Sequence, residues 1–151
     1  MTDTAVTPGG IALTDEMAQA VNRALENGKP ITVAYVDADG QPHLSFRGST
    51  QTYAPDQLAI WVRDPQGGIL TAIERNPRLT LLYRDPETRT MLMFYGRGRV
   101  ETSEEAHRTV YDQSPELERQ RDPERKGKPV VIDLDRVEGL TPGGRVQMSR
   151  S

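Results

Sequence analysis

The chain has 151 residues, 35% of them hydrophobic and 27% charged, which provides apolar side chains for one compact domain and leaves two full domains unexpected. Nineteen lysines and arginines against 22 aspartates and glutamates give a net charge of −3, so no nucleic-acid partner is expected, because such domains carry a basic excess. With no cysteine and two histidines, disulfides, thiol nucleophiles, thiolate metal sites and multi-histidine metal centres are excluded, and no metal site is expected.

The first 13 residues lack the basic start and the apolar segment of a signal peptide, so we expect a flexible leader and a cytoplasmic protein. No apolar run is long enough to span a bilayer, and no membrane partner is expected. Thr14 is a predicted N-cap, and the apolar spacing after it predicts an amphipathic helix over residues 14–27. Gly28 and Pro30 should end this helix.

Three strands are expected next. Residues 31–36 and a run from His43 flank the turn residues 37–40, which predicts a hairpin. Residues 58–63 alternate in polarity and predict a third strand. Leu58, Ile60 and Val62 share one face of that strand, and Ala59, Trp61 and Arg63 share the other.

A short helix is predicted from Ile69 to the Asn76-Pro77 pair, because the residue before a proline avoids the helical region. Strands are then predicted over residues 79–83 and 91–100. Gly96 and Gly98 in the second of them indicate a bulge or a close approach of backbone.

The last third of the chain begins with Thr102 and Glu105, whose spacing predicts a capping box and a helix over 103–113. The charged segment 115–128 is interpreted as an exposed helix or loop. Residues 130–134 and 137–140 predict a final strand, broken near Asp135, and the residues after Pro142 look like a tail. The expected organisation is therefore a leader over 1–13, one domain over 14–140 and a tail over 141–151.

About six strands, mostly joined by hairpins, with short flanking helices, predict an α+β fold with a mainly antiparallel sheet. A six-stranded barrel is the expected closure, because a barrel removes exposed strand edges. A doubly wound parallel sheet is disfavoured, since the turns between the early strands are too short for a crossover helix.

Several catalytic motifs are missing from the sequence: the Gly-x-Gly-x-x-Gly fingerprint after the first strand, the Walker lysine motif and the Gly-x-Ser-x-Gly elbow. His43 and His107 are each expected at the surface, outside any chemistry. This leaves a reaction carried by a cofactor, with the protein supplying binding and orientation. Every basic residue between positions 41 and 100 is an arginine, which favours a small anionic ligand: Arg47, Arg63, Arg75, Arg78, Arg84, Arg89, Arg97 and Arg99.

A candidate phosphate site combines residues of two strands and a helix start. Ser45, Arg47 and Ser49 share one strand face by the period of two, and Trp61 and Arg63 share another. Gly67 and Gly68 open the next helix, where backbone amides can face an anion. An equally supported interpretation makes Arg47 and Arg63 solvated charges at a barrel end and Trp61 a core residue.

Four segments occur in one order and spacing: Asp39–His43, Ser45–Ser49, the Leu58-x-x-Trp61-x-Arg63 strand, and Ile73–Arg78. This set resembles the pyridoxamine 5'-phosphate oxidase-like family of split-barrel flavoproteins over residues 14–140. The resemblance implies a split β-barrel homodimer that binds FMN at the subunit interface and acts on a small molecule. It also implies the cofactor-binding residues Arg47, Gly48, Ser49, Trp61, Arg63 and Gly68.

The sequence departs from the family where relatives that bind FMN well often carry lysines, since Thr50 and Gly67-Gly68-Ile69 stand there instead. The expected phosphate contacts are therefore Arg47, Ser49, Arg63 and backbone amides. The leading hypothesis is an FMN-dependent oxidoreductase that passes hydride or electrons between a nicotinamide or other donor and an unassigned small molecule. The alternatives are a deazaflavin-dependent reductase, or a non-catalytic flavin- or haem-binding protein on the same barrel.

Overall fold

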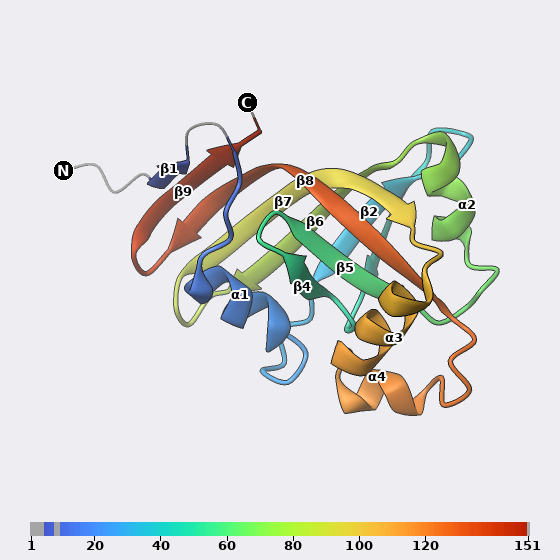
Figure 1. Cartoon of the computed structure of the whole chain (residues 1–151). Helices are drawn as coiled ribbons and strands as arrows, with labels where there is room; N and C mark the ends of the chain where they lie inside the picture. The colour runs from blue at the N-terminus through green and yellow to red at the C-terminus, as the bar shows by residue number, and fades with distance from the viewer. Residues whose placement is uncertain (1–4, 8–9, 151) are drawn as a thin grey trace.

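The fold is described by a computed structural model, which covers residues 5–7 and 10–150. Within these residues, nine strands form one largely antiparallel sheet and four helices lie against it (Figure 1). The elements in chain order are β1 (Ala5–Thr7), α1 (Asp15–Asn22), β2 (Thr32–Val36), β3 (Pro42–Phe46), β4 (Gln51–Ala54), β5 (Gln57–Val62), α2 (Gly68–Arg75), β6 (Arg78–Asp85), β7 (Thr90–Val100), α3 (Glu104–Gln113), α4 (Glu116–Gln120), β8 (Lys128–Thr141) and β9 (Gly144–Ser149).

The long strand β8 connects two arms of the sheet. Its first half pairs with β5 and its second half with β9, while β7 runs along its other edge. The strand order is β1-β9-β8-β7-β6-β2-β3, and β4 pairs only with β5 among the described residues. The sheet curls into a barrel. The barrel stays open between β3 and β4, because no ladder joins these two strands in the described residues. The α+β, mainly antiparallel fold expected from the sequence is confirmed.

The pairing of β7 with β8 shifts by one residue between Tyr95 and Gly96, so Asp135 is the extra residue of a bulge. A Cβ atom on Gly96 would overlap the carbonyl oxygen of Asp133, and only glycine allows this approach of the two backbones. The close approach predicted at Gly96 is confirmed. The break predicted near Asp135 is this bulge, within one continuous strand.

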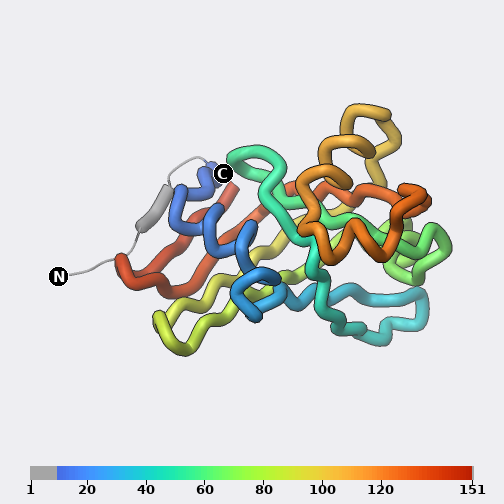
Figure 2. Tube along the Cα trace, turned by 90° about the horizontal axis from the view of Figure 1, so that it is seen from below, coloured from blue at the N-terminus to red at the C-terminus, as the bar shows by residue number. Residues whose placement is uncertain are grey.

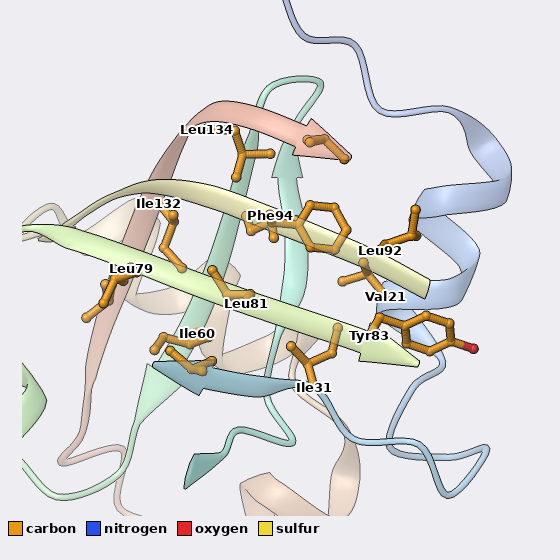
Figure 3. Close-up of a cluster of buried hydrophobic side chains, with 14 of the residues drawn as sticks. Val21, Ile31, Ile60, Leu79, Leu81, Tyr83, Leu92, Phe94, Ile132 and Leu134 are labelled. Atoms are coloured by element: carbon orange, nitrogen blue, oxygen red, sulfur yellow. The ribbon is translucent and has the colours of Figure 1, made fainter. Parts of the chain in front are cut away.

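The core lies inside the barrel, where alternate residues of the strands point inward (Figure 3). Side chains of β5, β6, β7 and β8 converge there, including Ile60, Leu81, Phe94 and Ile132, which are fully buried. α1 closes one side of the core with Met17 and Val21. Its N-cap is Thr14, as predicted, since the Thr14 hydroxyl accepts a hydrogen bond from the Met17 amide at 3.2 Å.

A second, smaller apolar cluster lies on the outer face of β5. Ala59 and Trp61 pack there against Val110 and Tyr111 of α3. Figure 2 shows the orange coil of α3 beside the green chain that carries β5. α3 is capped by Ser103, whose hydroxyl accepts from the Ala106 amide at 3.1 Å, one residue later than the predicted capping box. The two faces predicted for residues 58–63 are therefore real, and both are buried as far as Val62, whereas Arg63 is exposed.

The ends of the chain differ from the sequence-based expectation. Residues 144–149, predicted to be a tail, form β9 and pair with β8, with Val146 and Met148 buried. Residues 5–7 of the predicted leader form β1, parallel to β9, while residues 1–4 and 8–9 lie outside the described residues. Together with β4, these additions explain why six strands were predicted and nine are described. No helix in the described part of the chain has the length and apolar character needed to cross a membrane.

Candidate functional site

The turn from β3 into β4 fixes the position of Arg47. The Arg47 amide donates to the Ile31 carbonyl at 2.8 Å, and its own carbonyl accepts from the Thr50 hydroxyl at 2.7 Å. On the side chain, Nε donates to the Ser45 hydroxyl at 3.1 Å. The predicted alternation of Ser45 and Arg47 thus becomes a contact, and the backbone of Arg47 is held on both sides of the residue.

A cavity of about 190 Å³ lies where this turn meets the outer end of β5. Five of the six predicted cofactor-binding residues line it: Arg47, Gly48, Ser49, Trp61 and Arg63. Larger hollows of about 540 and 570 Å³ lie between the ends of β7, β8 and β9 and beside α2. The small cavity is the better candidate, because it alone among these three is lined by three arginines, the third being Arg121 after α4.

The Ser49 hydroxyl is engaged within the fold. It donates to the Trp61 carbonyl at 3.1 Å and accepts from the Trp61 amide at 2.8 Å, and both residues are buried. The Trp61 indole N–H donates to Asp122 at 2.9 Å. The polar groups of Ser49 and Trp61 are therefore bonded within the fold, and the charged groups of the cavity lining are the arginines and Glu118.

Two of the three arginines lie close to one carboxylate, that of Glu118 in α4. Its Oε1 lies 3.7 Å from Arg63 Nε, and its Oε2 lies 3.9 Å from Arg121 Nη1. Burial lowers the pKa of the Arg47 guanidinium, and this outweighs the opposite influence of Tyr35; neighbouring Arg63 lowers the pKa further. Because arginine stays protonated in proteins, the site holds a partly buried excess of positive charge. Such a site can bind an anion.

Gly68, the sixth predicted residue, lies outside this cavity. It is exposed at the start of α2, and a Cβ atom there would lie 3.1 Å from the Tyr35 hydroxyl. The N-cap of α2 is Gly67, so no side chain caps the first amides of this helix. The structure thus separates the helix-opening glycines from the arginine cavity.

The two histidines lie outside the cavity as well. His43 stacks on Tyr35 with ring centroids 4.7 Å apart, and its Nε2 lies 2.8 Å from Asp37 Oδ2. The ring of His107 meets the edge of Trp61 at 4.8 Å, on the α3 side of β5. In the described residues no group of three or more histidines and acids is placed to hold a metal.

Sequence reasoning missed Glu118 and Arg121. Segment 115–128 was interpreted as an exposed charged stretch, yet Glu118 and Asp122 within it are buried. Nothing local in the sequence distinguishes these two acids from their exposed neighbours, because their partners lie about 60 positions away on β5 and in the loop after it.

Solved structures share this fold. HupZ from Group A Streptococcus matches with a TM-score of 0.67 and 21% identity, over 87% of this chain and 97% of that one. A Clostridium acetobutylicum protein related to general stress protein 26, of the pyridoxinephosphate oxidase family, matches with a TM-score of 0.65 and 10% identity, over 90% and 96%.

An FMN-binding protein from Syntrophomonas wolfei matches with a TM-score of 0.61 and 10% identity, over 84% of this chain and 88% of that one. No protein-family model and no curated protein matches the chain. At these identities the likeness establishes the fold.

Proposed function

We propose, from the split-barrel fold that this chain shares with pyridoxamine 5'-phosphate oxidase-like and FMN-binding proteins, that it binds FMN and acts as a flavin-dependent oxidoreductase on a small molecule. The observation that carries the proposal is the cavity in which Arg47 and Arg63 lie together. Planar guanidinium groups match the oxygens of a phosphate and can bind two of them at once.

The size of the cavity fits the phosphate end of FMN and not the whole cofactor. Pockets that enclose a drug-sized ligand measure about 300–1,000 Å³, whereas this one has about 190 Å³. The flavin ring would therefore lie beyond its mouth. Phe46 lines the cavity and is 71% exposed, and Leu44, on the same face of β3, is 74% exposed. These two side chains offer an apolar surface for a flat ring.

The role of the chain's own residues is binding and orientation. Arg47 and Arg63 would hold the phosphate, and the rigid turn at Arg47 would fix where the rest of the ligand begins. Bound flavin supplies the redox chemistry itself, accepting and returning electrons as a hydride or singly. Neither histidine lines the cavity, so we assign no side chain of the described residues as a general acid or base.

We propose in addition that the protein is a homodimer, in which a second copy covers β3. Leu44 and Phe46 are the two most exposed large hydrophobic side chains of the described residues. β3 is also the last strand of its arm of the sheet, so one edge lacks a partner strand in the described chain. A second copy would cover this apolar surface and enclose the flavin ring.

The test is to measure the affinity of the protein for FMN and for riboflavin, which lacks the phosphate, by flavin fluorescence. Arg47→Ala and Arg63→Ala should each weaken FMN binding by about tenfold or more, or about 1.4 kcal/mol. Riboflavin binding should change much less, and Arg84→Ala, an exposed arginine of β6, serves as the control. Unchanged FMN affinity in both cavity variants would defeat the assignment.

Loading experiments separate this proposal from the alternatives. A visible flavin absorption band that survives desalting, followed by turnover with a nicotinamide donor, is the expected result. If the protein is colourless, takes up no FMN and changes the fluorescence of a deazaflavin, the assigned cofactor would be the deazaflavin and not FMN. Tight flavin or haem binding without turnover would make the protein a non-catalytic binder.

A further inference from the structure

Glu118 lines the arginine cavity, next to Arg63 and Arg121. Its side chain is only 10% exposed, whereas those of Arg63 and Arg121 beside it are 44% and 53% exposed. The carboxylate therefore lies beside guanidinium groups that are more accessible to solvent than its own side chain. It stands where an anionic ligand would be expected to bind.

The carboxylate is weakly held for a buried charge. Its ion pairs of 3.7 and 3.9 Å are longer than hydrogen bonds, and in the described chain it accepts no hydrogen bond. A buried charge stabilises a fold only when its geometry is good and its remaining lone pairs are satisfied. Glu118 thus offsets part of the positive charge of the arginines, but it makes no short ion pair or hydrogen bond that would hold α4 firmly in place.

Gly48 leaves room for this carboxylate. A Cβ atom at position 48 would lie 3.0 Å from Glu118 Oε2 and 3.0 Å from Leu25 Cδ2. Any larger residue would crowd the carboxylate inside the cavity. The turn after β3 and helix α4 are therefore matched in shape at this point, although they are some 70 positions apart in the sequence.

We propose that Glu118 is an internal counterion, which a phosphate-bearing ligand must displace from the Arg47, Arg63 and Arg121 cluster. Three positive charges against one negative leave a cluster that still attracts anions. A phosphate beside a retained carboxylate would suffer like-charge repulsion at short range. Glu118 therefore lowers the affinity of the site for phosphate, and neutralises part of the charge of the arginines when no ligand is bound. This inference rests on the proposed function only in taking the cluster as the phosphate site.

The test uses Glu118→Gln, which keeps the size of the side chain and removes its charge, and inorganic phosphate as the probe. Phosphate affinity is taken from the rise of the melting temperature with phosphate concentration, because a ligand that binds only the folded state stabilises it. Without phosphate, the variant should melt below the wild type. It should bind phosphate about tenfold more tightly than the wild type, and Glu116→Gln, an exposed acid of the same helix, should behave like the wild type.

Phosphate affinity in Glu118→Gln that equals or falls below that of the wild type would overturn the proposal and leave Glu118 as a structural contact. The same tightening in Glu116→Gln would also overturn it, since the effect would then reflect net charge alone. If Glu118→Gln does not fold, Glu118→Asp retains the charge and withdraws the carboxylate by one methylene. It should bind phosphate about threefold more tightly, and equal or weaker binding rejects the proposal. Absence of FMN binding would refute the proposed function without changing these phosphate results.

Discussion

At the scale of single residues, Asp122 links the candidate site to the loop that follows α4. Its carboxylate accepts hydrogen bonds from the Trp61 indole at 2.9 Å, the Gly127 amide at 2.8 Å and the Lys126 amide at 3.0 Å. Burial raises the pKa of Asp122, but these three bonds and the nearby His107 lower it by more, so that the net shift is downward. The ionised form is therefore the one that stabilises the fold.

We expect Asp122→Asn to reduce the free energy of unfolding at pH 7 by about 2 kcal/mol. The asparagine amide cannot accept all three hydrogen bonds, because its NH2 group would face N–H donors of the protein. Since the folded pKa is depressed, this contribution is complete above the ordinary value of 3.8 and is lost as the pH falls through the folded value. Urea unfolding from pH 7 to pH 3 should show the two proteins converging in acid.

Glu124→Gln is the control for this experiment, because Glu124 is exposed and pairs only with exposed Lys126 in the described residues. Its effect should stay within about 0.5 kcal/mol at every pH. A constant difference between Asp122→Asn and the wild type down to pH 3 would contradict the expected role of the ionised carboxylate.

The residues of the cavity show what a sequence can predict at this scale. The strand period of two led to the prediction of Arg47 and Arg63, and both line the cavity, although each lies just past the end of its strand. Glu118 was missed because its burial results from the packing of α4 against a turn about 70 positions earlier, which no local pattern records. Ser49, predicted as a phosphate contact, lies in the cavity lining, and its hydroxyl bonds to a backbone carbonyl 12 positions away.

At the scale of elements, the long strands were predicted well, whereas the helix predicted over 14–27 ends at Asn22 and is followed by turns as far as Gly28, and the short terminal strands were missed. The strand predicted at 91–100 is described as β7 over Thr90–Val100. β9 was missed because only Val146 and Met148 mark its inward face, and the preceding Gly143 and Gly144 resemble the beginning of an irregular tail. The tertiary contact with β8 makes this short segment a strand.

We expect Met148→Ala to lower the free energy of unfolding by about 2–3 kcal/mol, because Met148 is buried and its truncation leaves a cavity between β9 and the core. Gln147→Ala, on the exposed face of the same strand, should change stability by less than about 0.5 kcal/mol. Chemical denaturation measures both. Equal, small effects would mean that β9 does not contribute to the folded core in solution.

At the scale of the whole molecule, the fold class followed from hairpins and alternation, but the openness of the barrel did not. The gap between β3 and β4 depends on the turn at Arg47–Thr50, which directs the chain away from β3 and toward β5. The arginine cavity lies beside this gap, and the exposed side chains of Leu44 and Phe46 lie on β3 at its edge. The site and the proposed dimer surface are thus consequences of one topological feature.

For the proposed dimer, we expect the wild type to sediment as a dimer and Phe46→Glu to sediment as a monomer, because a charge placed in an apolar interface must be desolvated without a partner. Leu140→Glu, at an exposed leucine of β8, is the matched control and should leave the mass unchanged. Analytical ultracentrifugation distinguishes these cases. A monomeric wild type, or a dimer that persists in Phe46→Glu, would exclude this face as the interface.

The position of β8 near the end of the chain also governs the order in which the protein can assemble. β5 gains its central neighbour only when β8 is present, and Gln57 and Asp133, which hydrogen-bond across this pairing, are separated by 76 positions. During translation, the early hairpins would therefore emerge from the ribosome long before β8, the strand that completes the barrel. Non-local pairing of this kind slows folding and lengthens the exposure of apolar strands. We therefore expect the apolar side of β5 to stay uncovered during synthesis until β8 has emerged.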